Sequence, residues 1–437
     1  MSEAPRDAMT TPLRIGIAGL GTVGAGTFRL LRDNADLIER AAGRPLRVTA
    51  ISARDRGRDR GIDLAGCLWV DNPLDLVTHP AVDVVVELVG GEDGVARALV
   101  EAALGQGKPV VTANKALLAH HGTAIGRLSR ARRVPLGFEA AVAGGIPIIK
   151  ALREGLAANR VTRVYGILNG TCNYVLSAMQ QTQRDFGDIL AEAQQLGYAE
   201  ADPGLDIDGI DAAHKLAILA GVAFGTPVDL KAVYVEGIRH ISALDIAYAD
   251  ELGYRIKLLG LARRTPQGIE QRVHPCMVPS SNPLAAVDGV FNAVVVEGDV
   301  VGRVVLQGRG AGAGPTASAV VADLIDIASG RGHAAQLADA PTGDASRSVG
   351  MEHHLGGCYI RLMVQDQPGV IADVAAALRN ERISMEAMLQ RGRAPGGTVP
   401  VVLTTHPGEE QAMRRALGEI ALLAAMTEPP RMIRIET

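Results

Sequence analysis

An apolar run that stops abruptly at glycines constrains the fold of this chain more than any other feature. Residues Leu13 to Gly19 read LRIGIAG, and apolar residues at helical spacing follow from Val23 to Leu37. This order predicts a buried strand, a tight turn and a helix. Since strands covered on both faces are continuously apolar, the first part of the chain predicts an α/β fold with a doubly wound parallel sheet. Further apolar runs in this rhythm lie at 47–52, 82–90, 108–114 and 134–140, with helical patterns at 95–104 and 116–130.

The turn after the first apolar run carries a GxGxxG motif. Its glycines allow a tight turn and a close approach of the backbone to a pyrophosphate, which the start of the following helix attracts. Between a strand and a helix, the motif predicts a Rossmann-type domain that binds a dinucleotide. The alternative is a glycine-rich turn in an ordinary α/β protein. The residues that we expect at the cofactor are Gly19, Gly21, Thr22, Val23 and Gly24.

The end of the second apolar run bears on the choice of cofactor. An NAD-selective site places an acidic residue there, which binds the ribose hydroxyl. This chain reads Ser52-Ala53-Arg54 instead, and an arginine suits a 2′-phosphate. We therefore expect Arg54 to contact NADP. Because Asp55 follows directly, NAD stays open as the alternative cofactor.

Two further strand ends carry candidate functional residues. Lys115 follows the apolar run at 108–114, at the edge where open α/β sheets bind ligands, so we expect it in the cleft rather than as a solvated strand cap. Glu139 lies in the apolar stretch FEAAVAGGIPIIK, before glycines that leave carbonyl groups exposed. Its carboxylate fits two roles equally well: binding a monovalent cation together with loop carbonyls, or capping the next helix.

The pattern of the chain changes near Pro147, where longer helical patterns begin to mix with strand-like segments. This mixture predicts an α+β lobe. A stretch over 329–357 is rich in Gly, Ala and Asp, lacks periodicity and is expected to be a linker. From Cys358 the pattern predicts a compact βαββαβ unit. The predicted domains are 1–146, 147–328 and 358–437. The α+β prediction for the second domain rests on the segments 163–170, 189–196, 211–223, 230–237 and 293–298.

Composition excludes several classes of protein. The 437 residues are 47% hydrophobic with a formal net charge of −4, and no basic block with interleaved aromatic residues occurs, so we expect neither nucleic acid nor membrane as a partner. No apolar run approaches the roughly 18 residues of a membrane span. The four cysteines lack CxxC spacing, which argues against a zinc site and for a reducing compartment. We expect a cytoplasmic protein that binds a small molecule.

One acidic stretch has no counterpart elsewhere in the chain. Residues 197–215 read GYAEADPGLDIDGIDAAHK and gather five carboxylates around one lysine. If a helix starts near Asp206, then Asp208 and Asp211 are one turn apart, and Asp211 shares a face with Lys215. The plain alternative is a solvated acidic loop with an Asp206 helix cap and an ordinary surface ion pair.

Six motifs together give the chain a family resemblance. In order, they are GIAGLGTVG, VVTANKALLA, FEAAVAGGIPII, ILNGTCNYVL, GYAEADPGLDIDGIDAAHKLAILA and GRGAGAGPTASAVVADLID. From Leu13 to about Ala328 this combination resembles homoserine dehydrogenase, a family that interconverts L-aspartate 4-semialdehyde and L-homoserine with NAD(P)H. The tail from Cys358, with DQPGVIADVA after its first strand, resembles an ACT domain.

The resemblance implies roles for individual residues. An amino-acid substrate needs carboxylates for its ammonium group and donors for its carboxylate and carbonyl groups. Lys215 matches the proton donor and Asp211 orients it, while Lys115 is a second amine for the carbonyl oxygen, and the sequence leaves open which lysine transfers the proton. The implied substrate residues are Glu200, Asp206, Thr171 and Gly170. The resemblance implies two further cofactor contacts, Gly310 and Gly312. It also implies ligands for a monovalent cation such as Na⁺, namely Glu139 and the carbonyls of Val142, Gly144 and Ile146.

The ACT resemblance implies assembly and regulation. Such units pair with one another, so we expect a homodimer or homotetramer. The resemblance implies L-threonine as effector. The segment QDQPGV places proline and glycine at the start of the first ACT helix, where backbone N–H groups are expected to be free for the carboxylate of the effector. The alternative is an ACT unit that only assembles subunits.

Two other classes of function stay open at this point. A sensor without turnover could combine a dinucleotide fold with an ACT unit, but the joint presence of Glu200, Asp211 and both lysines argues against it. An aldehyde-oxidising, acyl-forming dehydrogenase needs a nucleophilic cysteine, and Cys172 is the candidate near the expected site. His214 and His274 are expected to be structural.

Overall fold

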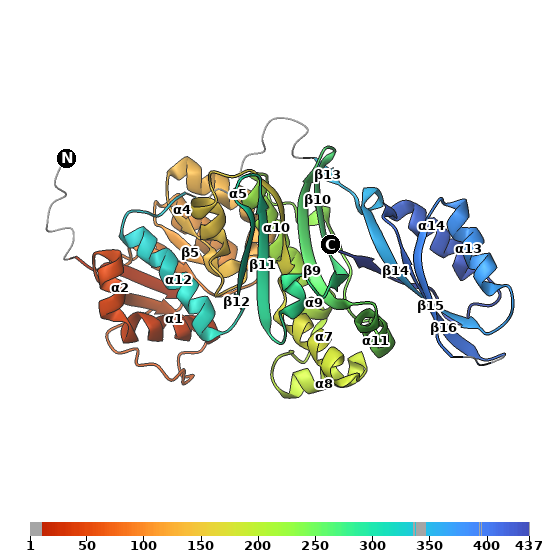
Figure 1. Ribbon diagram of the computed structural model, residues 1–437. Coiled ribbons are helices and arrows are strands. Elements are labelled where there is room, and N and C mark those ends of the chain that lie inside the picture. Colours follow the sequence, from red (N-terminus) through yellow and green to blue (C-terminus); the bar gives the residue numbers. More distant parts are fainter. Residues whose placement is uncertain (1–10, 335–336, 338–346, 393, 395, 437) are drawn as a thin grey trace.

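The computed structural model describes residues 11–334, 337, 347–392, 394 and 396–436. Figure 1 shows three units in a row: a nucleotide unit (red to orange, with α12 in cyan), a central lobe built on long strands (yellow to green), and a C-terminal unit (blue). Within the described ranges, no helix has the length and apolar character needed to cross a membrane.

The nucleotide unit is built on a six-stranded parallel sheet in the order β3-β2-β1-β4-β5-β6. The predicted doubly wound parallel sheet is therefore confirmed. Helix α12 comes from much later in the chain and packs beside α1 (Figure 1). The strands are β1 (Leu13–Ala18), β2 (Leu46–Ser52), β3 (Leu68–Trp69), β4 (Val84–Glu87), β5 (Val110–Thr112) and β6 (Leu136–Gly137); the helices are α1 (Thr22–Asp33), α2 (Ala35–Ala42), α3 (Asp75–Thr78), α4 (Val95–Gly105), α5 (Lys115–Arg132) and α12 (Ala313–Ala328).

Two local predictions for this unit differ from the structure. The single helix expected from Val23 to Leu37 is two helices, because the backbone leaves helical geometry at Asn34 (φ −111°, ψ 23°). The amide N–H of Asn34 still donates to the carbonyl of Leu30 at the end of α1. The carbonyl of Asn34 accepts the N–H of Ile38 in α2. Strand β3 was not predicted because two residues are too few to show a pattern.

The central lobe and the C-terminal unit share one twelve-stranded mixed sheet. Its main path runs β12-β11-β7-β9-β10-β18-β14-β16-β15, and β8, β13 and β17 join beside this path. The strands are β7 (Val161–Ile167), β8 (Val233–Val235), β9 (Tyr254–Thr265), β10 (Gly268–Pro279), β11 (Phe291–Gly298), β12 (Gly302–Arg309), β13 (Ser348–Val349), β14 (Leu355–Gln365), β15 (Met385–Gln390), β16 (Thr398–Thr405), β17 (Gly408–Glu409) and β18 (Arg431–Ile435). The helices are α6 (Ile148–Lys150), α7 (Gly170–Thr182), α8 (Phe186–Gln195), α9 (Gly204–Ile207), α10 (Ile210–Phe224), α11 (Ala243–Glu251), α13 (Val370–Asn380) and α14 (Glu410–Ala421).

The C-terminal unit has the predicted βαββαβ order, β14-α13-β15-β16-α14-β18. Both helices lie on one face of its sheet (Figure 1), over a core that includes Ile360, Leu362 and Val401. The loop before α13 has paired N–H groups at its first positions. The N–H groups of Asp366 and Gln367 are not free, because they donate to the carbonyls of Gly397 and Gln365.

Strand β18 joins the two units into one sheet. It pairs with β14 in antiparallel fashion and with β10 in parallel fashion, where Cys276 and Met277 lie opposite Arg434 and Ile435. The expected linker is partly structured, since β13 within it also pairs with β10 and β14 begins at Leu355. Part of that segment, 335–336 and 338–346, lies outside the described residues.

Buried charges cross this junction. Arg272 on β10 is 1% exposed and is paired with both Glu270 and Glu436. Arg434 on β18 pairs with Glu410 Oε1 at 2.6 Å and with Glu236 Oε2 at 2.8 Å. Because each guanidinium is matched by two carboxylates from different segments, the C-terminal unit is held on the lobe by paired charges as well as by backbone pairing.

We expect Arg272→Met to lower the free energy of unfolding by about 3–5 kcal/mol, because it removes the buried guanidinium that pairs with both Glu270 and Glu436. Urea denaturation followed by circular dichroism measures the change. The matched control is Arg303→Met, which removes an exposed ion pair with Glu297 and should cost no more than about 1 kcal/mol. Equal effects of the two substitutions would contradict the stabilising role of the buried network.

Candidate active site

The glycine motif forms a turn that requires glycine at two positions, Gly19 and Gly24. Gly19 has a φ of +95°, and a Cβ there would lie 2.3 Å from the carbonyl oxygen of Leu88. A Cβ at Gly24 would lie 2.0 Å from the carbonyl oxygen of Gly19, whereas one at Gly21 would meet no atom within 4 Å. Helix α1 begins at Thr22 without a side-chain cap, so its first N–H groups face open space beside Gly21. This turn fits a pyrophosphate at the helix N-terminus.

A cavity of about 290 Å³ lies beside this turn, at the ends of β1 and β2. Ser52, Ala53 and Arg54 line it together with Arg56 and Trp69. The guanidinium of Arg56 lies 5.7 Å from the centre of the Trp69 ring, within cation–π range. The cavity thus offers a flat ring and two cations where the adenosine end of a dinucleotide would lie.

A second cavity of about 390 Å³ opens between the nucleotide unit and the central lobe. It is lined by the N-terminal ends of α5 and α7, by α10, and by the loop between β12 and α12. The structure brings together here all the predicted catalytic and substrate residues, Lys115, Gly170, Thr171, Glu200, Asp206, Asp211 and Lys215. Two of the predicted cofactor contacts, Gly310 and Gly312, line the same cavity.

Asp211 holds the two lysines of this cleft. Its Oδ1 lies 2.9 Å from Lys115 Nζ, and its Oδ2 accepts a hydrogen bond of 2.7 Å from Lys215 Nζ. Lys215 also donates to the carbonyl oxygen of Leu168 at 2.8 Å. Burial opposes the charge on Asp211, but Lys215 and Lys115 outweigh it and hold the pKa of Asp211 well below its usual range. The predicted Asp211–Lys215 pair on one helix face is therefore present, and it is buried.

Lys115 sits among carboxylates. Burial lowers the pKa of Lys115, but Asp211, Asp206 and Glu200 outweigh it, so that the pKa lies above the ordinary lysine value. Lys115 therefore stays protonated at neutral pH. A cation held beside an open cavity can stabilise negative charge on a ligand oxygen.

The predicted helix starting near Asp206 is interrupted in the structure. Helix α9 ends at Ile207, Gly209 has a φ of +84°, and α10 begins at Ile210. Asp208 is therefore not in the cleft cluster and pairs with Arg239 instead. Asp206 does face the cleft, where it accepts hydrogen bonds from Asn169 at 2.7 Å and Thr171 at 3.0 Å.

Two asparagines in the cleft were not predicted. Asn169 caps α7 through its side-chain oxygen, and its Nδ2 donates to both Asp206 and Asp211, at 2.7 and 2.8 Å. Its place in the motif ILNGTCN was the only signal for this role. Asn292 on β11 is 1% exposed, and its Nδ2 has no hydrogen-bond partner among the described residues. Because it lines the cleft, this amide is positioned to donate to a ligand.

Glu139 has the bonds of a helix cap. Its two carboxylate oxygens accept backbone N–H groups of Ile149 and Lys150, at 2.9 and 2.8 Å. Its own N–H donates to Asp323, whose pKa burial and the Glu139 charge raise to about 7. Each carboxylate oxygen of Glu139 keeps a further lone pair, so the cap does not exhaust its binding capacity.

The remaining candidates are structural. Cys172 is fully buried, and burial followed by the charges of Asp206 and Asp211 raises its pKa well above the usual value, which disfavours a thiolate nucleophile. His274 is fully buried and accepts a hydrogen bond from Arg272. His214 packs edge-on against His120, with ring centres 5.5 Å apart.

Fold and cleft together define a class: a dinucleotide-dependent oxidoreductase joined to an ACT unit. Family models agree, matching "Homoserine dehydrogenase, NAD binding domain" over residues 19–139, "Homoserine dehydrogenase" over 147–325 and "ACT domain" over 359–421. The chain belongs to the homoserine dehydrogenase family.

Relatives match over nearly the whole chain. Homoserine dehydrogenase of Neisseria gonorrhoeae is 48% identical over 98% of this chain and 99% of its own, and that of Pseudomonas aeruginosa is 47% identical over 97% and 99%. The crystal structure of a homoserine dehydrogenase from Thiobacillus denitrificans superposes with a TM-score of 0.92 at 46% identity, covering 98% of this chain and 99% of that one. A hyperthermophilic archaeal homoserine dehydrogenase in complex with NADPH matches with a TM-score of 0.63 at 28% identity, over 74% of this chain and 100% of that one.

We expect Gly24→Ala to weaken NADPH binding by on the order of 10-fold or more, because its Cβ would displace the Gly19 carbonyl and distort the turn. Fluorescence of the bound nicotinamide measures the affinity. The control is Gly105→Ala at the end of α4, where an added Cβ meets no atom within 4 Å. Unchanged affinity in Gly24→Ala would argue against the turn as the pyrophosphate site.

Proposed function

We propose that this protein interconverts L-aspartate 4-semialdehyde and L-homoserine by hydride transfer, as a homoserine dehydrogenase. The observation that carries the proposal is the position of Asp211, which holds Lys115 and Lys215 at a cleft between the nucleotide unit and the central lobe. The cleft includes the loop that leads into α12, the helix packed against α1 of the nucleotide unit. The bound nicotinamide supplies or accepts the hydride. Purified protein given L-homoserine with NADP should produce reduced nicotinamide, measured by its absorbance; a folded protein without turnover on NADP or NAD would refute the proposal.

The acidic side of the cleft is proposed to bind the amino-acid substrate. Glu200 lines the cleft and has an exposed carboxylate, which suits the α-ammonium group. Asp206 is anchored by Asn169 and Thr171, so its carboxylate is fixed in place before the substrate arrives. The donors for the substrate's carboxylate are the backbone of Gly170 at the start of α7 and the amide of Asn292, which has no partner within the described ranges.

Lys215 is proposed as the proton donor for the carbonyl oxygen. Asp211 Oδ2 and the Leu168 carbonyl fix its ammonium group at 2.7 and 2.8 Å, which orients the remaining N–H towards the cleft. Lys115 is proposed to stabilise the negative charge that develops on the same oxygen, because nearby carboxylates keep it protonated. In the reverse direction, Lys215 takes the hydroxyl proton back.

We expect Lys215→Met to lower kcat by on the order of 10²-fold or more, since a positioned acid/base is lost, while NADPH affinity stays near that of the wild type. Glu200→Gln should instead raise KM for homoserine by about 10-fold with a smaller change in kcat. Steady-state kinetics separates the two effects. Matched surface controls are Lys231→Met and Glu192→Gln. Small and equal effects in all four variants would indicate that the acidic stretch is a solvated surface loop.

NADP is proposed as the preferred cofactor, with NAD as the weaker alternative. The cavity at the end of β2 is lined by Arg54 and Arg56. Asp55 does not line it, and its side chain accepts the N–H of Gly57 instead. The archaeal relative that binds NADPH gives independent support.

We expect Arg54→Leu to raise KM for NADP by about 10-fold and to leave KM for NAD nearly unchanged, since an arginine contact to a phosphate is a charge-assisted hydrogen bond. Kinetics with each cofactor checks this. Arg58→Leu, on the same loop but outside the cavity, is the control. An equal change for both cofactors would count against a 2′-phosphate contact.

We also propose that Glu139 binds a monovalent cation such as Na⁺. Its further ligands are the carbonyls of Val142, Gly144 and Ile146, the last of which already accepts an N–H from Ile148. The loop lies against the β12–α12 loop, because a Cβ at Gly144 would come within 2.5 Å of the Gly310 carbonyl oxygen. A cation there would stiffen both walls of the cleft.

Regulation and assembly complete the proposal. We propose domains at 1–146, 147–328 and 358–437, in line with the spans of the three family models. The ACT unit is proposed to bind L-threonine as an inhibitor. Assembly into a homodimer or homotetramer is supported by β12, which pairs only with β11 among the described residues and exposes Val305 at this sheet edge.

We expect millimolar L-threonine to inhibit the full-length enzyme about 5- to 150-fold, the range of typical allosteric coupling. Initial rates at fixed homoserine and NADP measure this. D-threonine is the control, because it has the same chemical groups with the mirror-image configuration. Absence of inhibition by the L-isomer would leave the ACT unit with an assembly role only.

A further inference from the structure

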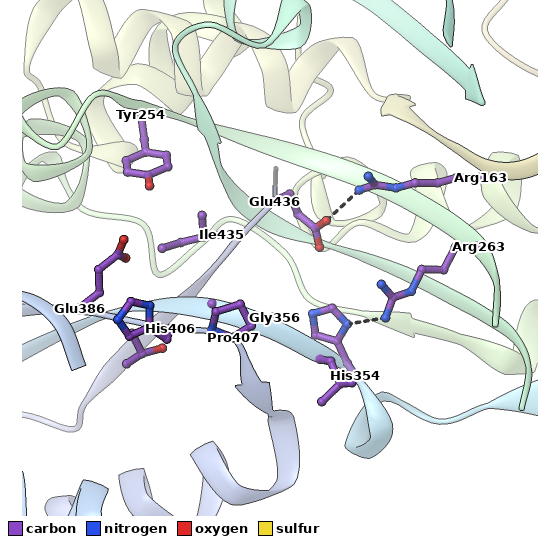
Figure 2. A pocket seen from close by; sticks show the side chains of 13 residues that line it. Arg163, Tyr254, Arg263, His354, Gly356, Glu386, His406, Pro407, Ile435 and Glu436 are labelled. Atoms are coloured by element: carbon purple, nitrogen blue, oxygen red, sulfur yellow. Dashed lines mark hydrogen bonds and ion pairs between the residues drawn. The ribbon is translucent and has the colours of Figure 1, made fainter. Parts of the chain in front are cut away.

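A third cavity, of about 310 Å³, lies where the C-terminal unit meets the central lobe. Figure 2 shows Tyr254 and Glu386 on one side of it and Arg163, Arg263 and His354 on the other. Its walls come from β7 and β9 of the lobe and from β14, β15 and β18 of the C-terminal unit. A ligand in this cavity would therefore touch both units. Its volume is at the small end of the range for ligand sites.

His354 carries an unsatisfied polar atom in this wall. Its side chain is 4% exposed, and its Nδ1 lies 2.8 Å from Glu270 Oε1. Its Nε2 is buried and has no hydrogen-bond partner among the described residues. A Cβ at Gly356, another wall residue, would lie 2.6 Å from that Nε2, so the atom faces the glycine side of the cavity. Buried polar atoms of native proteins are almost always paired, so this nitrogen marks the position of a missing polar group.

The charges around the cavity define the chemistry of that group. Arg163 pairs with Glu436 and Arg263 pairs with Glu270, so this wall carries two guanidinium cations. These cations suit a ligand carboxylate. Because Nδ1 of His354 faces the Glu270 carboxylate, it carries a proton, and in that tautomer Nε2 accepts from a hydroxyl or ammonium donor.

The opposite wall adds negative charge. Glu386 makes no ion pair with any described residue, and its carboxylate stands beside Tyr254 (Figure 2). A ligand with one carboxylate, one ammonium group and a short polar side chain matches this set of groups. Ile435 and Gly356 supply the apolar floor between the two walls. A nucleotide phosphate would be disfavoured by the carboxylates that line the cavity.

We propose that this junction cavity, rather than the first loop of the ACT unit, is the binding site for the regulatory amino acid. The inference rests on the proposed regulation by threonine and adds the place where the effector binds. Its ammonium or hydroxyl group donates to His354 Nε2, its carboxylate binds the arginine wall, and Glu386 balances its positive charge.

The position also gives a route to the catalytic cleft. Arg163 of the cavity wall lies on β7, and the chain continues from this strand to Leu168 and Asn169. Leu168 accepts the hydrogen bond of Lys215, and Asn169 binds Asp206 and Asp211. Five residues of extended chain, about 16 Å, separate wall and cleft. A shift of β7 on ligand binding would move the atoms that orient Lys215.

The test compares full-length variants with L-threonine as the probe. His354→Asn removes Nε2 but keeps an amide donor near the Nδ1 position, so the bond to Glu270 can persist. Gly356→Ala fills the space beside Nε2 from the other side. The controls are His353→Asn, a neighbouring histidine whose side chain is 70% exposed, and Gly408→Ala, where a Cβ meets no atom within 4 Å. NADPH affinity, measured in every variant, reports an intact nucleotide unit.

We expect both cavity variants to bind threonine at least about 10-fold more weakly in calorimetry and to need correspondingly more of it for inhibition, with NADPH affinity unchanged. The controls should respond like the wild type. Equal threonine binding and inhibition in all variants would overturn the junction site while regulation by threonine stands. A wild-type protein that neither binds threonine nor is inhibited by it would overturn both.

Discussion

The contact of Asp211 with Lys115 and Lys215 is the interaction on which the candidate site depends. Lys115 begins α5 of the nucleotide unit, and Lys215 lies on α10 of the central lobe, so one carboxylate joins the two walls of the cleft. Its anchoring by Asn169 fixes the start of α7 to the same point. Asp211 and Lys215 are buried because their partners compensate their charges, and the cleft geometry follows from that compensation. A site built in this way is ordered before substrate binds.

A second set of paired charges fixes the C-terminal unit in place. Arg272 and Arg434 are buried where the strands of the two units meet, a junction that apolar side chains could also have formed. Paired charges require specific partners, whereas apolar side chains tolerate small slips. We interpret the network as the reason that β10 and β18 meet in one register. The central lobe and the C-terminal unit are therefore parts of one sheet and not separate domains joined only by a linker.

The sequence predicted those features that local pattern encodes. The parallel sheet followed from continuous apolar runs, the turn from its glycines, and the cleft residues from the family motifs around Lys115 and Asp211. The break between α9 and α10 was missed because it depends on the left-handed backbone at Gly209, although the glycine itself was visible. The junction was out of reach for another reason. One edge of β10 is covered by β13, β8 and β18, and nothing local in the chain marks such distant partners.

The place of β18 in the sheet also affects how the chain is made. It is the last described strand in sequence order, yet it sits between β10 and β14, which the ribosome produces earlier. Until β18 emerges, the edge of β10 at Cys276 and Met277 is unpaired, and Arg272 lacks the carboxylate of Glu436. Open strand edges are where nascent chains associate wrongly. The nucleotide unit can fold during translation, whereas the joined sheet closes only once the last strand leaves the exit tunnel.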